Sequence, residues 1–366
     1  MLASAHQPNT VLPKHHVGNG TFQNVEHDYT LRPTKQIGNA ITMLTHIRGK
    51  KPEGLVEHPI CTPNFEAIHN PDPNVIQYTW IGHSSFLVQF GGYNILTDPV
   101  FCKRASPTNL LGPKRLRPVP MTVEQLPRID IITISHNHYD HCDRQAIKAI
   151  FKKFGEFATI YVPLNLKTWT QRKLKNIDHS RVIEMDWWQS LNHNFGDTSL
   201  GNMEITFLPA QHWSNRTFFD YKKSLWGGWG FHFTPNSTLL KSRCVYHCGD
   251  SGYSEIIFKD IGEKYSVPRG NIDLAFIPIG AYAPTFVLQV QHVDPTEAYL
   301  ASLLIKCKKA VAMHWGTFDL SLERIMEPKE KLEKVEQVYA KGRPPTLDGE
   351  PFFMAVNIGE TKMTVQ

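Results

Sequence analysis

Four side chains of the kinds that bind metal ions lie close together in the middle of the chain. An apolar run over residues 129–134 predicts a strand buried on both faces, and residues 135–141 follow it as Ser-His-Asn-His-Tyr-Asp-His. In an extended loop, successive side chains point to opposite sides, so the first two histidines, two residues apart, lie on the same side. The aspartate and the last histidine can face a neighbouring position. One short loop can then supply ligands to two metal ions. The candidate ligands are His136, His138, Asp140 and His141.

Three more candidate ligands follow other predicted strands. His212 comes after residues 203–208, Asp250 after 243–247, and His314 after 310–313. Taken singly, each has a plain structural alternative, which is a hydrogen-bonded core histidine or an aspartate that forms a turn. Together with the loop at 135–141, they predict that several strand ends meet at one metal centre.

The remaining pattern predicts a core of two sheets with helices outside. Apolar or β-branched runs predict strands at 75–81, 85–90, 94–96, 159–162, 274–277 and 354–357 in addition to those named above. Helices are expected after Asp143, where apolar residues recur on one face, after Asp294 in the sequence Asp-Pro-Thr-Glu, and over 329–341. There is no regular alternation of strand and helix and no glycine-rich nucleotide loop, which argues against a Rossmann fold.

Two stretches bear on domains and membranes. Residues 1–75 are rich in Pro, His and Asn, with one short helix expected at 34–48, so we expect an N-terminal extension before a catalytic domain at 76–366. Residues 274–293 lack charged side chains, but prolines and glutamines interrupt them, which favours a buried strand and a loop over a membrane span. We therefore expect a cytoplasmic protein whose contact with a membrane is peripheral.

Charge excludes one class of partner. The chain has 39 Lys and Arg against 34 Asp and Glu, a formal charge of +5. This excess is too small for a dedicated nucleic-acid-binding protein, but it is compatible with an anionic substrate or membrane face.

The order of the ligand motifs resembles that of the metallo-β-lactamase superfamily. The resemblance extends from about residue 75 to the C-terminus, and it implies an α/β (α+β) fold, the αββα sandwich, with two zinc ions at one edge of two packed sheets. It implies that His136, His138 and His212 hold one zinc ion. Asp140, His141 and His314 would hold the other, and Asp250 would bridge both. Asp98 and His83 are expected to orient the ligands.

Narrower motifs are similar to those of the phospholipase D family that hydrolyses N-acyl-phosphatidylethanolamine. They lie at 82–86, 135–141, 210–213, 226–231, 249–253, 280–282, 291–295 and 313–318, together with a basic loop at 104–115. This resemblance implies a phospholipid substrate and a homodimer. Residues 1 to about 40 carry no motif that matches the family.

Two metal ions about 3.5 to 4 Å apart suit an in-line displacement at phosphorus. A bridging hydroxide would attack phosphorus, the N-acylethanolamine oxygen would leave, and phosphatidic acid would remain. Asp140, Asp250 and His292 are the expected catalytic residues. His292 would stabilise or protonate the leaving group, and its alternative is a structural histidine beside a helix.

Substrate contacts are expected from a basic loop and from aromatic side chains. Lys114 and Arg115 lie near Leu110 and Leu111, a mixture that suits an anionic membrane surface; a solvated basic loop is the alternative. The aromatic candidates for an acyl channel are Trp226, Trp229, Phe231 and Tyr282, and Tyr139 is a further candidate for contact with the substrate. Ordinary core packing is their alternative.

Two other functions remain open at this point. One is a lactonase or a sugar-phosphate hydrolase with the same fold. The other is a non-catalytic lipid-binding protein, against which the complete set of ligands argues.

Overall fold

The computed structural model describes residues 13–26, 56–108, 110–194, 199–217, 219–342 and 349–364. The helix expected at 34–48 lies outside these ranges.

Two seven-stranded sheets form the centre of the molecule. In the first sheet the order is β16-β3-β4-β5-β6-β7-β8, antiparallel from β16 to β5 and parallel from β5 to β8. Its strands are β3 (Ile76–Gly82), β4 (Ser85–Phe90), β5 (Tyr93–Thr97), β6 (Ile131–Thr133), β7 (Thr159–Pro163), β8 (Val182–Met185) and β16 (Thr361–Thr364).

The second sheet has the order β15-β14-β13-β12-β11-β10-β9, parallel from β15 to β12 and antiparallel from β12 to β9. Its strands are β9 (Ser190–Asn192), β10 (Gly201–Leu208), β11 (Gly228–Pro235), β12 (Arg243–His247), β13 (Leu274–Pro278), β14 (Ala310–Met313) and β15 (Phe353–Met354).

Alternating side chains bury both faces of the first sheet. Phe86 and Ile131 belong to the cluster between the sheets, whereas Leu87 and Ile132 pack into the cluster beneath helix α3 (Arg144–Phe154). Because both faces need apolar residues, these strands are continuous apolar runs rather than alternating ones. Between the sheets, the rings of Phe86 and Phe276 lie 4.2 Å apart.

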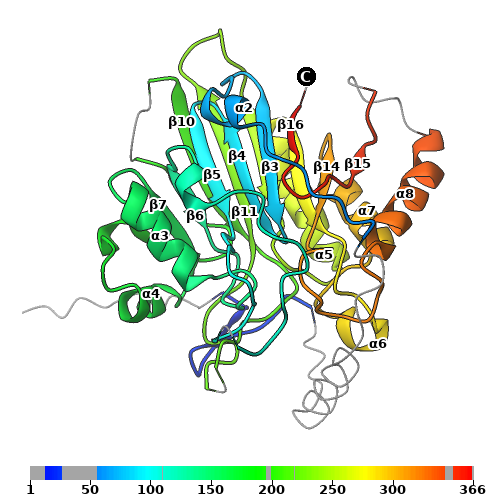
Figure 1. Ribbon diagram of the computed structural model, residues 1–366, viewed down its shortest axis with the longest axis horizontal. Helices are drawn as coiled ribbons and strands as arrows, with labels where there is room; N and C mark the ends of the chain where they lie inside the picture. The colour runs from blue at the N-terminus through cyan, green and yellow to red at the C-terminus, as the bar shows by residue number, and fades with distance from the viewer. Residues whose placement is uncertain are drawn as a thin grey trace, which may run out of the picture.

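Helices cover the two outer faces, which confirms the predicted αββα sandwich (Figure 1). Helix α3 lies over the first sheet, and its N-cap is Asp143, whose side chain accepts hydrogen bonds from the backbone N–H groups of Gln145 and Ala146. Helix α7 (Pro295–Leu304), with the expected capping box of Asp294 and Glu297, lies over the second sheet with α5 (Glu255–Asp260) and α8 (Glu327–Tyr339). The remaining short helices are α2 (Phe65–His69), α4 (Lys167–Lys173), α6 (Thr285–Leu288), a π-helix at Ile261–Ser266, and 3₁₀ turns at Val123–Gln125, His179–Arg181, Val267–Arg269 and Ala340–Gly342.

Strands β8, β9, β11 and β16 were not expected from the sequence pattern. Strand β11 is rich in glycine, which disfavours strands in general. Here a Cβ at Gly230 would lie 2.3 Å from the ring of Tyr265, so the absence of a side chain allows that ring to pack against the strand.

Residues 13–26 pack against the sandwich. They form a small hairpin of β1 (His16–Val17) and β2 (Thr21–Phe22), in which Phe22 is buried in the core and its N–H donates to the carbonyl of Lys222. The boundary at residue 75 stays a prediction. In the described part of the chain, no helix combines the length and the apolar character that crossing a bilayer requires.

Candidate metal centre

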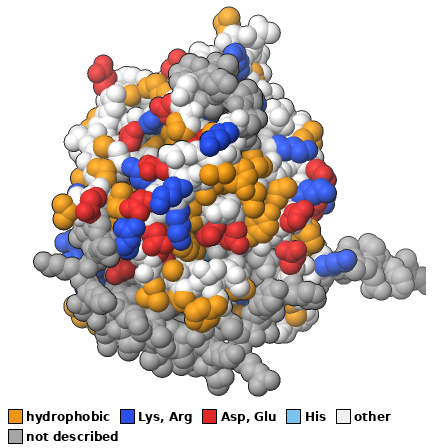
Figure 2. Space-filling view, turned by 90° about the vertical axis from the view of Figure 1, so that its right-hand side faces the viewer, with side chains coloured by type: hydrophobic (Ala, Val, Ile, Leu, Met, Phe, Trp, Pro, Cys, Tyr) orange, Lys and Arg blue, Asp and Glu red, His pale blue; other side chains and the backbone are white. Residues whose placement is uncertain are grey.

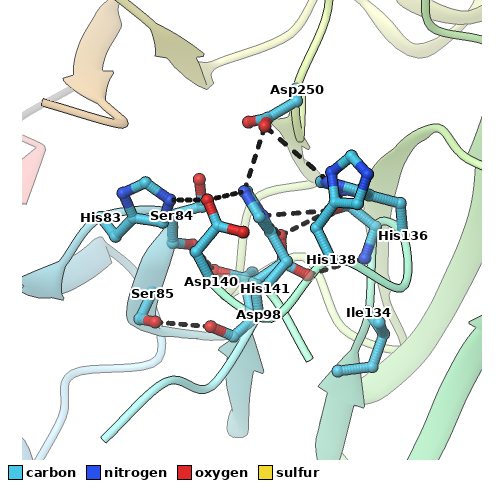
Figure 3. A network of polar contacts seen from close by, with 12 residues as sticks. His83, Ser84, Ser85, Asp98, Ile134, His136, His138, Asp140, His141 and Asp250 are labelled. Atoms are coloured by element: carbon cyan, nitrogen blue, oxygen red, sulfur yellow. Dashed lines mark hydrogen bonds and ion pairs between the residues drawn. The ribbon is translucent and has the colours of Figure 1, made fainter. Parts of the chain in front are cut away.

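The seven expected ligands meet at one edge of the sandwich. Strands β12 and β14 run in the same direction, β10 shares it because both β10 and β12 are antiparallel to β11, and the loop after β6 reaches this edge from the other sheet. Figure 3 shows the side chains of the β6 loop and Asp250 pointing toward one another. The structure therefore brings together residues that are up to 178 positions apart, from His136 to His314.

Three histidines form the first group, and their ring nitrogens converge. His136 Nε2 lies 2.9 Å and His212 Nε2 lies 3.4 Å from His138 Nδ1. In two of these rings the other nitrogen has a partner: His136 Nδ1 lies 2.9 Å from the hydroxyl of Ser135, and His212 Nδ1 lies 3.0 Å from the carbonyl of Gln291. Because that carbonyl can only accept, His212 Nδ1 carries the hydrogen and Nε2 presents a lone pair to the group.

A second group contains His83, Asp140, His141 and His314. The Oδ2 atom of Asp140 lies 3.0 Å from His83 Nε2, 3.7 Å from His141 Nε2 and 3.9 Å from His314 Nε2. His83 thus contacts the carboxylate that the sequence analysis assigned to a metal, in the position expected of an orienting residue.

Asp250 lies between the two groups. Its Oδ2 atom is 3.1 Å from His141 Nε2 and 3.0 Å from His314 Nε2 in the second group. The same atom is 3.8 Å from the Nε2 atoms of His136 and of His212 in the first group. One carboxylate therefore reaches both groups, as a bridging ligand must.

Asp98 fixes the start of the β6 loop from behind. One carboxylate oxygen accepts a 2.6 Å hydrogen bond from the backbone N–H of Ser135, and the other accepts from the Ser135 hydroxyl and from His141 Nδ1, at 2.6 and 2.8 Å. This arrangement directs His141 Nε2 toward Asp250, a position compatible with the orienting role that the family resemblance implies for Asp98.

The buried atoms of the centre fit a metal ion. Asp250 Oδ1 is buried and has no hydrogen-bond partner among the described residues, and the buried Nε2 atoms of His141 and His314 approach Asp250 Oδ2 at 3.1 and 3.0 Å without hydrogen-bond geometry. Unpaired buried polar atoms are costly. A dication would satisfy them, since imidazole and carboxylate groups are the ligands that zinc and similar ions prefer. The chain thus carries a candidate metal-binding cluster, whereas the identity and number of the ions belong to the proposal below.

Burial and neighbouring charges set the protonation of the cluster. Burial lowers the pKa of His138 to about 4, and that of His83 to about 3. Burial alone would raise the pKa of Asp250, but His141 and His314 together hold it well below its usual range. The carboxylate of Asp250 is therefore ionised, and the imidazoles of His83 and His138 are neutral near pH 7, which is the state in which a histidine can bind metal.

His292 also reaches the centre. Its Nδ1 atom lies 3.9 Å from Asp250 Oδ2, and its ring stacks on that of His314 with centroids 5.1 Å apart. The side chain is 12% exposed, so it lies at the rim of the cluster. It forms a group of possible ligand atoms with His212 and Asp250, a position compatible with contact to either a metal ion or a substrate.

Asn24 is a site residue that the sequence analysis missed. Its Oδ1 atom accepts a 3.1 Å hydrogen bond from the backbone N–H of His212 and a 3.0 Å hydrogen bond from Trp226 Nε1. The N-terminal segment thus holds the loop that carries one of the candidate ligands. Asn24 is 188 residues from His212 in a segment without a recognisable motif, so no sequence signal indicated this contact.

The basic loop divides into exposed and buried parts. Lys114 is exposed, as are Leu110 and Leu111, at 83% and 69%. Arg115 is buried: its guanidinium donates a 2.5 Å hydrogen bond to the carbonyl of Val100 and lies 5.1 Å from the ring centroid of Phe318. This corrects the expectation that Arg115 faces lipid, because its donors are engaged inside the fold.

The aromatic candidates also divide. Trp226 and Trp229 are at most 1% exposed, and their indole N–H groups donate to the carbonyls of Ala210 and Ile134. They are core residues, which corrects their expected place in an acyl channel. Tyr282 is buried, with its hydroxyl 2.9 Å from a carboxylate oxygen of Glu327.

Tyr139 has a different position, on the wall of a cavity. It is half-buried, its hydroxyl donates to the carbonyl of Arg216, and the Arg216 guanidinium lies 4.0 Å from the centroid of its ring. The cavity has a volume of about 370 Å³ and is also lined by Trp169. Of the aromatic candidates, Tyr139 therefore lines a cavity, and none of the seven expected metal ligands lines the same cavity.

Comparison with known proteins agrees with this geometry. Residues 93–315 match the model of the beta-lactamase superfamily domain. N-acyl-phosphatidylethanolamine-hydrolyzing phospholipase D 1 of Caenorhabditis elegans is 37% identical over 259 residues, which cover 70% of this chain and 68% of that protein. The mitochondrial N-acyl-phosphatidylethanolamine-hydrolyzing phospholipase D of Saccharomyces cerevisiae is 32% identical over 71% of this chain, which spans about half (51%) of the yeast protein.

A solved structure supports the fold alone. A metallo hydrolase from the archaeon Ignicoccus hospitalis superimposes with a TM-score of 0.52 and 23% identity, over 80% of this chain and 99% of that one.

Proposed function

The chain belongs to the beta-lactamase superfamily and is a metal-dependent hydrolase of that fold, and from this premise we propose that it hydrolyses N-acyl-phosphatidylethanolamine to N-acylethanolamine and phosphatidic acid. The proposed cofactor is a pair of zinc ions, and the proposed reaction is attack of solvent oxygen on phosphorus. The identities of 37% and 32% to two phospholipases that are named for this substrate support it.

The observation that carries the proposal is the position of Asp250 between two groups of ligands. A single carboxylate oxygen lies 3.0 to 3.8 Å from nitrogen atoms of both groups. Two bound zinc ions would activate water near neutral pH and neutralise charge on the phosphoryl oxygens, as displacement at a phosphodiester requires.

The residues of the chain have separate roles in this proposal. Asp250 and Asp140 supply the negative charge that retains the ions, and Asp98 and His83 hold ligand side chains in place. His292, at the rim beside Asp250, is positioned to donate a hydrogen bond to the oxygen that leaves. Tyr139, on the cavity wall, is the aromatic candidate for contact with the lipid.

The test is to follow solvent oxygen. Hydrolysis of N-acyl-phosphatidylethanolamine in oxygen-18 water should give labelled phosphatidic acid and unlabelled N-acylethanolamine, measured by lipid mass spectrometry. Label in a fatty acid would mean attack on a carbonyl carbon and would refute the proposal. Absence of lipid turnover by the metal-loaded protein would favour the lactonase or sugar-phosphate hydrolase alternative.

Two variants examine the roles within the site. Asp250→Ala should lower the metal content and abolish hydrolysis, because it removes the carboxylate shared by both groups. His292→Ala should slow turnover while the metal content stays unchanged. A fully active Asp250→Ala protein would contradict the two-metal proposal, and a His292→Ala protein that merely loses zinc would make His292 a ligand.

We also propose that the protein acts as a homodimer on an anionic membrane surface in the cytoplasm. Exposed Leu110 and Leu111 beside Lys114 support membrane contact. Sedimentation analysis of the purified protein tests the dimer, since a single species with the mass of one chain would exclude it.

A further inference from the structure

A third group of candidate metal ligands lies apart from the centre described above. It consists of His15, His16 and Asp186, whose ligand atoms all lie within 4.8 Å of one another. The two histidines belong to the N-terminal segment, and Asp186 directly follows strand β8 of the first sheet. The group therefore joins parts of the chain that are 170 residues apart.

The Asp186 carboxylate contacts both rings, and each of its two oxygen atoms faces one histidine. His15 Nε2 lies 2.7 Å from Asp186 Oδ1, and His16 Nε2 lies 2.7 Å from Asp186 Oδ2. Among the described residues, these two histidines are the ion-pair partners of Asp186. The group offers one carboxylate and two imidazole nitrogens that face it.

Neighbouring residues hold all three side chains in place. The ring of His15 packs against that of Trp187 with centroids 4.4 Å apart, and the ring of His16 packs edge-on against Phe22 at 5.1 Å. The backbone N–H of Trp187 donates a 2.8 Å hydrogen bond to Asp186 Oδ1. Preorganised ligands lose little freedom when an ion binds.

The group is shielded but accessible. The side chains of His15, His16 and Asp186 are 10%, 17% and 14% exposed. A dication can therefore reach them without opening the core, and water can complete its coordination where the protein supplies only three ligands.

We propose that His15, His16 and Asp186 form a separate binding site for a late first-row dication such as Zn²⁺, and that the ion fastens the N-terminal segment to the catalytic sandwich. Two imidazoles and one carboxylate are a ligand set that suits this class of ion. When the ion takes the place of the Nε2–H···O contacts, the ring hydrogen of each neutral imidazole moves to Nδ1 through solvent, and a lone pair on Nε2 then faces the ion.

The N-terminal segment connects this site to the catalytic centre. The same segment buries Phe22 in the core and places Asn24 on the backbone of His212. An ion that binds only when the segment is docked stabilises the docked state, by linkage. Its occupancy should therefore favour the arrangement in which Asn24 holds the His212 loop.

The test compares zinc stoichiometry in matched variants of the full chain. In His16→Gln, the glutamine amide can still donate a hydrogen bond to Asp186, but it is a poor ligand for zinc. After chelation and titration with Zn²⁺, the wild-type protein should bind one equivalent more than His16→Gln, measured by elemental analysis after gel filtration. Equal stoichiometry would overturn the proposal and leave a hydrogen-bonded contact only.

A second variant and a second measurement keep the result independent of folding and of the proposed catalysis. Asp186→Asn has nearly the same shape and should lose the same single equivalent. In Asp250→Asn, which alters the catalytic centre, Zn²⁺ should still slow amide hydrogen exchange over residues 13–26. If Zn²⁺ leaves that exchange unchanged, the proposal fails even where the phospholipase activity stands.

Discussion

At the scale of single residues, the candidate centre depends on the partners behind its ligands. Each of three ligand imidazoles has its second ring nitrogen beside a fixed group: Ser135 for His136, Asp98 for His141, and the Gln291 carbonyl for His212. These contacts decide which nitrogen is free to bind metal.

Asn24 provides a test of such support from outside the family domain. Asn24→Leu removes the acceptor for the His212 N–H and leaves a buried donor unpaired, which costs about 1–3 kcal/mol. We expect weaker zinc binding, by roughly 10- to 100-fold, the effect typical of lost ligand support. Competition with a chromophoric chelator measures it. Asn24→Asp keeps the acceptor oxygen and should restore the affinity, whereas equal affinity in all three proteins would assign Asn24 no supporting role.

His58 gives a prediction about acid stability. Burial lowers its pKa from 6.5 to about 4. Its folded-state pKa is below its unfolded-state pKa, so the unfolded chain takes up the proton first, and stability falls as the pH drops from about 6.5 to 4. The loss amounts to about 3 kcal/mol for this one group.

Urea unfolding of the wild type and of His58→Phe at several pH values measures that loss. The variant has no group to titrate at this position, so the stability difference between the two proteins should change over that pH window. A difference that stays constant with pH would contradict the assigned protonation.

The residues of the centre were predictable to the extent that they follow strands. One loop contains four of the candidate ligands within six residues, namely His136, His138, Asp140 and His141. Each of the three distant candidates follows a predicted strand. Asn24 and the Gln291 carbonyl were not predictable, because an amide in a loop and a backbone oxygen have no pattern of their own. The expected lipid contact of Arg115 was wrong, because a basic stretch of sequence does not show which of its side chains the fold buries.

At the scale of elements, strand ends and tight turns place the ligands. His314 has φ 61° and Gly316 has φ 63°, so the chain turns sharply after β14. A Cβ at Gly316 would lie 2.5 Å from His58 Nε2. This turn therefore needs glycine both for its conformation and for the close approach of a neighbouring ring.

Gly316→Ala should destabilise the protein and disturb His314, with about 1–3 kcal/mol from backbone strain alone and more from the contact with His58. Gly270→Ala is the control, since Gly270 has φ 76° and nothing lies within 4 Å of its Cβ position. The free energy of unfolding and the zinc content report the two effects. Equal losses in both variants would show that the His58 contact has no cost.

Strands and helices with a strong local pattern were correctly predicted, as the strand at 243–247 and the capped helix after Asp294 show. Strand β11 was missed because its glycines carry no strand signal. Its pairing with β10 and β12 decides its conformation, and such partners are not visible in a local stretch of sequence.

At the scale of the whole molecule, surface charge distinguishes the face covered by α8 from the loop that carries Lys114. On the face that α8 covers, basic and acidic side chains lie interspersed (Figure 2), and ion pairs such as Lys331–Glu327 at 2.8 Å and Arg324–Glu330 at 2.6 Å join them. Such a face offers an anionic membrane little net attraction. The loop with Lys114, Leu110 and Leu111 combines exposed basic and apolar side chains and is a better candidate.

Lys114→Ala combined with Leu111→Ser should weaken binding to anionic vesicles and lower activity on vesicles more than on a dispersed short-chain substrate. Wild-type binding should weaken as salt rises, because salt screens surface charge. Vesicle sedimentation measures the binding. The matched control is Lys331→Ala combined with Val338→Ser, both on α8, which should leave vesicle binding unchanged. Equal loss of both activities in the loop variant would mean that the loop serves the catalytic centre.

The position of β16 has a consequence for folding during synthesis on the ribosome. Its residues Thr361–Thr364 pair with β3. One of the two edge strands of the first sheet is therefore synthesised almost 300 residues after β3, the strand beside it. While a ribosome is still extending the chain, β3 keeps a bare edge that can join another nascent chain. Until residue 364 emerges, the unpaired N–H and C=O groups along this edge of β3 favour association between growing chains over folding of each chain alone.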